Sequence, residues 1–131
     1  MILDANKILG TIFGKQWQRV RLLQEKDKPE MYLAHDICEI LEITNVTNAI
    51  KGINGQHRVD MVNRDKQYVK DWNPRRKVHL LSLAGVFQLI MHNRTKKCYE
   101  IRNYIACRYL PNAQQLVLHE PIRSKTRRTA A

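Results

Sequence analysis

The side chains of this 131-residue sequence that most clearly suggest a chemical function are its basic ones. Lys and Arg total 23 against 12 Asp and Glu, a net charge of +11. Residues 1–56 hold seven basic and seven acidic side chains, so the whole excess lies in residues 57–131, where 16 basic side chains face five acidic ones. An excess gathered in one part of a chain predicts a polyanionic partner such as nucleic acid. A basic surface that serves only solubility is the alternative.

The candidate nucleic-acid-binding residues are basic side chains for phosphates and two asparagines for base edges. Asparagine can bond adenine in a major groove, although at these positions it can equally cap a helix. The densest cluster, residues 72–77, contains Pro74 and suits either a phosphate clamp or a nuclear import signal. The candidates are Arg19, Arg21, Asn45, Asn48, Lys51, Arg58, Arg64, Lys66, Lys70, Arg75, Arg76, Lys77, Lys96, Lys97 and Arg102.

Enzyme chemistry finds little support in the sequence. It has no glycine-rich phosphate loop, no nucleophile elbow and no H-E-x-x-H motif. His35 and Cys38 have one metal-like spacing, but the second half of a zinc site is missing, and Cys38 fits a helix core better. We therefore predict no catalytic residue, no metal site and no cofactor. A metal-dependent nuclease is a minor alternative, because residues 25–28 resemble an acidic-acidic-lysine grouping, although in a predicted turn.

Length and composition predict one soluble domain. At 15.5 kDa and 44% hydrophobic residues, the chain can bury a single ordinary core. It has no apolar run of membrane-spanning length and no secretory layout at its start, which predicts an intracellular protein without a membrane partner. Three cysteines without a C-x-x-C pair indicate a reducing compartment. We expect a domain over residues 1–115 and a flexible basic extension over 116–131.

The first predicted elements form a β-hairpin. Alternation over residues 18–22 predicts a strand, and a turn leads to a second strand over 31–33. Trp17, Arg19 and Arg21 would share one face of the first strand, where they can stack bases and pair phosphates. The other interpretation is an ordinary solvated face with Trp17 half buried.

Helical spacing begins after this hairpin. It predicts a helix over 35–42 and a second over 47–51, capped by Thr44 or Asn45, in an arrangement like a helix-turn-helix. Asn45, Asn48 and Lys51 would then be exposed, and two copies would have to associate for paired half-sites to be read.

The second half of the chain alternates strands with longer helices. Short strands are expected over 58–62 and 67–69, with a flexible basic tip between them, and a buried strand over 78–81. Ser82 begins a helix that ends near Asn93. Thr95 begins another that runs to about residue 109, where Pro111 stops it. Lys96 and Lys97 at its start oppose the helix dipole, a cost that a bound phosphate would reverse.

Four segments carry a resemblance to a known family. They are Phe13-Gly14 with residues 18–21, residues 31–41, residues 80–90, and residues 99–111, which end in Tyr-Leu-Pro. Together they resemble the Bro-N domain, the N-terminal module of baculovirus repeated-ORF proteins and many phage antirepressors. The sequence departs from the family pattern at Tyr32, at Leu83-Ala84, at Tyr104 and in the long basic segment 57–77.

The resemblance implies an α+β fold, a small antiparallel sheet packed against about four helices. It also implies a DNA-binding protein of viral, phage or mobile-element origin that modulates transcription or replication. The alternative it leaves open is an antirepressor-type module that binds a repressor or another regulatory protein. A homodimer is compatible with either. The compartment would be the nucleus or cytoplasm of an infected eukaryotic cell, or the bacterial cytoplasm for a phage protein.

Overall fold

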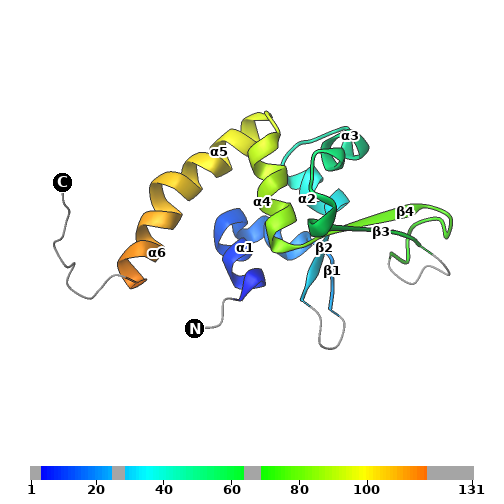
Figure 1. Ribbon diagram of the computed structural model, residues 1–131, viewed down its shortest axis with the longest axis horizontal. Helices are drawn as coiled ribbons and strands as arrows, with labels where there is room; N and C mark the ends of the chain where they lie inside the picture. The colour runs from blue at the N-terminus through cyan, green and yellow to red at the C-terminus, as the bar shows by residue number, and fades with distance from the viewer. Residues whose placement is uncertain (1–3, 25–28, 64–68, 118–131) are drawn as a thin grey trace.

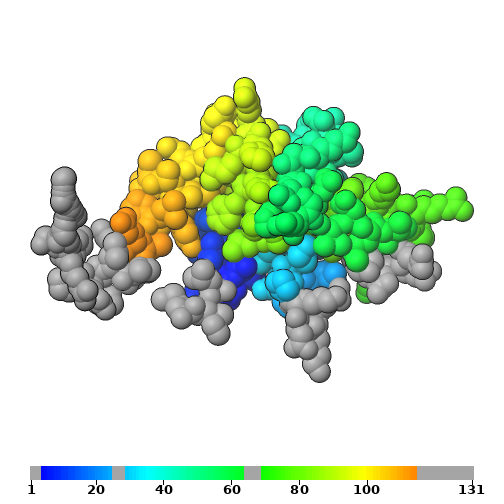
Figure 2. All heavy atoms as spheres, viewed as in Figure 1, coloured from blue at the N-terminus to red at the C-terminus, as the bar shows by residue number. Residues whose placement is uncertain are grey.

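A computed structural model describes residues 4–24, 29–63 and 69–117. Its centre is a four-stranded antiparallel sheet in the order β1-β2-β4-β3 (Figure 1). The β3–β4 hairpin extends beyond the body of the molecule at the end opposite α6 (Figure 2). The predicted hairpin of the first two strands is present, with Leu22 opposite Tyr32. The strands are β1 (Leu22–Leu23), β2 (Met31–Leu33), β3 (Arg58–Val62) and β4 (Lys77–Leu81).

The helices pack against one face of this sheet, which confirms the predicted α+β class. Asn45, Ser82 and Thr95 cap α3, α4 and α5 by accepting a backbone N–H three residues ahead, as their spacing predicts. The helices are α1 (Ala5–Phe13), α2 (Ala34–Ile40), α3 (Val46–Lys51), α4 (Leu83–His92), α5 (Lys96–Tyr104) and α6 (Leu110–Val117), with short segments η1 (Gly14–Arg19), η2 (Gly55–His57) and the π-helical η4 (Ile105–Tyr109).

Strand alternation divides the core between the two faces of the sheet. Tyr32 and Leu81 face the helices and belong to the main core cluster. Leu33 and Leu80, one residue away on the same strands, face the opposite side and pack with Val69. The segment that follows β3 therefore covers the face that the helices leave open.

Cys38 lies in the main cluster, as its helical spacing predicts. It is fully buried together with Cys98, whereas Cys107 is exposed. Burial raises the pKa of the Cys38 thiol to about 12, so this side chain stays protonated and behaves as an apolar group at neutral pH.

The strand predicted over residues 18–22 is wrong for all but its last residue, because β1 begins only at Leu22. Residues 14–19 form η1, and Trp17 is only 6% exposed. Its indole N–H donates to the Asn6 side-chain oxygen at 2.6 Å, and its ring stacks on Phe13 at 5.2 Å between centroids. Both partners come from α1, a helix that the sequence analysis did not predict. Trp17 is therefore a core residue and offers no surface for stacking bases.

The predicted stop at Pro111 is also wrong, because the helix continues through it. The turn before it is π-helical, and the Leu110 N–H donates to the carbonyl oxygen of Ile105, five residues back. In this turn a backbone N–H bonds to the carbonyl oxygen five residues back, not four. The change in hydrogen-bond pattern comes just before Pro111, which has no N–H to donate. As a result α6 spans the expected domain boundary at 115–116. No described helix is long and apolar enough to cross a membrane.

Two further predictions concern the segment after β3. The strand expected over 67–69 lies largely outside the described residues, and Val69 itself is not in a strand. The flexible tip at Arg64 and Lys66 also lies outside them.

Gly85 is the point at which α4 packs directly on backbone. A Cβ atom there would lie 2.4 Å from the carbonyl oxygen of His57. That oxygen accepts a hydrogen bond from the Ser82 N–H at 3.0 Å, so it cannot move away without breaking the junction of β4 and α4. This contact ties α4 to η2 and so to the start of β3.

We expect Gly85→Ala to lower the free energy of unfolding by about 1–3 kcal/mol or more, because the new methyl group overlaps backbone. Gly10→Ala is the matched control: its Cβ would lie 3.6 Å from Trp17, an ordinary contact. The control should be neutral or stabilise the domain by about 0.4–1 kcal/mol. Urea denaturation of both variants measures the difference, and equal stabilities would contradict the packing described here.

Candidate nucleic-acid interface

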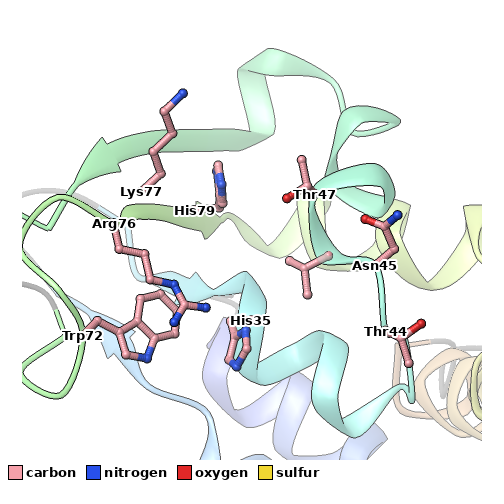
Figure 3. Close-up of a pocket in the computed structure, with 9 residues that line it drawn as sticks. His35, Thr44, Asn45, Thr47, Trp72, Arg76, Lys77 and His79 are labelled. Carbon is pink, nitrogen blue, oxygen red and sulfur yellow. The ribbon is translucent and has the colours of Figure 1, made fainter.

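A groove of about 650 Å³ lies between the β3–β4 hairpin and the helices α2 and α3 (Figure 3). It forms because the helices cover Leu81 of β4 but leave His79 and Lys77, two and four residues earlier on the same face, uncovered. None of the residues that line it is acidic. They are His35, Thr44, Asn45, Val46, Thr47, Trp72, Arg76, Lys77 and His79.

The buried side chain of Asn63 shapes the wall of this groove. Its amide nitrogen donates to the carbonyl oxygens of Val69 at 2.7 Å and Trp72 at 3.2 Å, and its oxygen accepts from the Val69 N–H at 2.9 Å. The Asn63 backbone N–H donates to the carbonyl oxygen of Arg76. Because the side chain is fully buried, its two bonds to the backbone of Val69 are protected from water. Asn63 thereby determines where Trp72 and Arg76 lie.

Trp72 lines the groove and holds two other lining residues, Arg76 and His35, against its ring. The Arg76 guanidinium carbon lies 3.6 Å from the centre of its ring. The His35 ring meets the indole edge-on at 5.0 Å between centroids. Figure 3 shows Trp72 and Arg76 on one side of the groove, with Thr44, Asn45 and Thr47 on the other. An arginine on an aromatic face is held by cation–π attraction and loses much of its rotational freedom before any ligand arrives.

The guanidinium carbon of Arg21 lies 5.7 Å from the centre of the same Trp72 ring, but the charge of Arg21 is already paired. Its backbone N–H, its Nε and its Nη2 each donate to the Asp36 carboxylate at 2.9 Å. Asp36 is 9% exposed and raises the pKa of Arg21, which therefore stays charged. The pair joins the approach to β1 to the first turn of α2.

His79 and Asp60 face each other across β3 and β4. The His79 Nδ1 lies 2.6 Å from the Asp60 carboxylate, and their Cα atoms are directly opposite in the register. Asp60 also lies 3.8 Å from the Arg58 Nε. The carboxylate of Asp60 is thus occupied by two neighbours.

Of the predicted binding residues, the groove brings together Asn45, Arg76 and Lys77. Asn45 is also the cap of α3, because its side-chain oxygen accepts from the Asn48 N–H at 3.0 Å. Arg75 is exposed beside them.

Besides Arg21, two more predicted residues have partners within the fold. Arg58 donates to the carbonyl oxygen of Ile50 at 2.7 Å, which connects β3 to α3. Arg102 donates to the carbonyl oxygens of Met91 and Asn93 at the end of α4.

The other predicted residues that the structure describes lie apart from the groove lining. Arg19 ends η1, Asn48 and Lys51 are exposed on α3, and Lys70 is exposed beside Val69. Lys96 and Lys97 form the first turn of α5, as predicted.

Several groove residues were not predicted from the sequence. Strand alternation through β4 could have linked His79 to Lys77, because both positions point to one face. His35, Thr44 and Thr47 carry no signal of their own, since only the packing of α2 and α3 against the hairpin brings them here. Asn63 likewise resembles any polar residue of a basic segment.

A four-stranded sheet with helices on one face and a basic hairpin beside an acid-free groove defines a small α+β binding domain. The sequence pattern described as the BRO family, N-terminal domain, matches residues 19–111, so this chain belongs to the Bro-N family. This match confirms the resemblance noted in the sequence. No curated protein and no solved structure matches the chain.

We expect Asn63→Ala to lower the free energy of unfolding by about 1–3 kcal/mol, because the Val69 N–H and two carbonyl oxygens lose their buried partner. Asn73→Ala is the control within the same segment: its side chain accepts from the Arg75 N–H, but it is exposed and water can replace it. Urea denaturation should show the smaller loss for Asn73→Ala. A larger loss of stability for Asn73→Ala than for Asn63→Ala would contradict the structural role of Asn63.

Proposed function

We propose that this domain binds DNA through the β3–β4 hairpin and the adjoining groove, and so modulates transcription or replication of a virus, phage or mobile element. Membership of the Bro-N family supports a DNA-binding or antirepressor-type domain at the level of the family. The choice of DNA and of this surface rests on the charge distribution of the chain.

The observation that carries the proposal is the run Arg75-Arg76-Lys77. All three side chains are exposed at the start of β4, and within the described residues no acidic group pairs with them. This differs from Arg21, which is bound to Asp36. Unpaired cations next to an acid-free groove are the arrangement that binds phosphates and releases their counterions.

Arg58 and Arg102 are less suited than the run at residues 75–77 to be the main DNA contacts. Because Arg58 and Arg102 donate to backbone carbonyls, their removal would disturb the fold as well as any phosphate contact. We place the main contacts on the hairpin, with Lys70 beside it. Lys51, Lys96 and Lys97 stay as secondary candidates, on α3 and at the start of α5.

Binding to duplex DNA should depend strongly on salt. With roughly five phosphates neutralised, log affinity should fall against log salt concentration with a slope of about −4.5. The double variant Arg75→Gln, Lys77→Gln should bind roughly tenfold or more weakly at 0.1 M salt and should lose about 2 units of slope. Fluorescence anisotropy with a labelled 20-base-pair duplex measures both quantities.

Lys7→Gln with Lys15→Gln is the matched control for this pair. Both lysines are exposed on α1 and η1, away from the groove lining, and the variant removes the same charge. It should retain the wild-type slope within about half a unit. If both double variants lose slope equally, binding is a property of net charge, and the hairpin has no special role.

The alternative function is an antirepressor-type module that binds another protein. The exposed apolar side chains of Met91, Tyr99 and Leu110, on α4, α5 and α6, favour this alternative. Under it, the Arg75 and Lys77 variant would keep its activity, and capture of the regulatory partner would survive nuclease treatment. Under our proposal, a DNA-bridged partner is lost on digestion.

We also propose that the domain is not an enzyme. Within residues 4–24, 29–63 and 69–117, no three metal-binding side chains gather in one place. The residues of the nuclease-like grouping at 25–28 lie outside the described residues. Incubation of plasmid with the protein and Mg²⁺ or Mn²⁺ should leave the plasmid unnicked.

A further inference from the structure

Arg76 differs from its two basic neighbours in one respect. The carbon of its guanidinium lies 3.6 Å from the centre of the Trp72 ring, whereas no aromatic contact holds Arg75 or Lys77 within the described residues. A phosphate contact needs no such support, because phosphate accepts hydrogen bonds from many directions and lysine binds it well as a point charge. Fixing a guanidinium plane is useful when a ligand presents two acceptors at a set spacing.

The donors of Arg76 are also unused by the protein. No group in the described part of the chain accepts a hydrogen bond from its guanidinium or pairs with its charge. Its stacking face is occupied by Trp72, so the edge of the guanidinium is left to meet a ligand in the groove (Figure 3). Arg21 is the contrast, since its two side-chain donors reach both oxygens of Asp36.

Asparagine is the other side chain that reads bases by two hydrogen bonds, and the structure places one across the groove. However, the side-chain oxygen of Asn45 accepts from the Asn48 N–H, and this bond sets the orientation of the amide. Pairing with adenine needs the oxygen and the nitrogen together. This cap leaves Arg76 as the groove side chain with a complete set of donors in a fixed plane.

We infer that Arg76 is a specificity-determining residue that reads guanine through its N7 and O6 acceptors, while Arg75 and Lys77 contact phosphates. Trp72 is its positioning residue. The inference rests on the proposed DNA-binding function and deepens it, because it assigns sequence preference to one side chain of that surface. A bidentate arginine–guanine pair discriminates against the wrong base by about 5- to 150-fold.

The test begins with selection of duplexes from a random 20-base-pair library by the wild-type domain. We expect the selected duplexes to share a guanine, and replacing that guanine by 7-deazaguanine should weaken binding about 5- to 150-fold, because it removes N7 and leaves the base pair and the phosphates intact. Arg76→Lys keeps the charge but not the plane. It should lose the guanine preference while its salt slope stays within about half a unit of wild type.

Arg75→Lys is the matched control: within the described residues no aromatic contact holds Arg75, so this variant should keep the preference. Trp72→Leu should reduce the preference with little change in salt slope, and its urea denaturation curve shows whether the domain is folded. Selection without any shared guanine, or an Arg76→Lys variant that retains the preference, would overturn the inference and leave the proposed DNA binding in place. Failure of the wild type to bind duplex DNA at all would overturn both.

Discussion

The two ends of the connection between β3 and β4 meet at one buried amide, that of Asn63. A buried amide costs free energy unless each of its donors and acceptors is paired, and here the backbone of Val69 and Trp72 supplies the partners. The connection can therefore return to β4 in few ways. One consequence is that Val69 completes the second core cluster on the face that the helices leave open. Another is that Trp72 and Arg76 come to lie just before β4, where both line the groove.

The fold also sorts the basic residues by what surrounds them. Arg21, Arg58 and Arg102 are bound to a carboxylate or to backbone carbonyl oxygens, and each joins two elements of the fold. The run at residues 75–77 has no such partners in the described structure and projects with the hairpin (Figure 2). The net charge of +11 therefore does not tell how many basic side chains a polyanion can contact. The number of phosphates bound depends on the unpaired fraction.

Much of the fold could be predicted from local patterns. Caps and helical spacing placed α2, α3, α4 and α5, and the short strands β3 and β4 were also expected, because each of these signals acts within a few residues. The errors at Trp17 and Pro111 have the opposite origin. Trp17 needs Asn6 and Phe13 of an unpredicted helix, and Pro111 depends on a π-helical turn that begins six residues earlier. The site was predicted in part: Asn45, Arg76 and Lys77 line the groove, but its histidines and threonines were missed.

The sequence by itself determined the α+β class, the Bro-N family and the concentration of charge after residue 56, because composition and short motifs carry these properties directly. Only the tertiary structure decided which charges are paired. Arg21 follows a valine and Arg76 lies between two other basic residues, and neither position shows in the sequence whether its charge is paired. One is bound to Asp36 and the other is held on Trp72 with its donors unused. Distances between residues far apart in the chain make that distinction, and a linear pattern does not contain them.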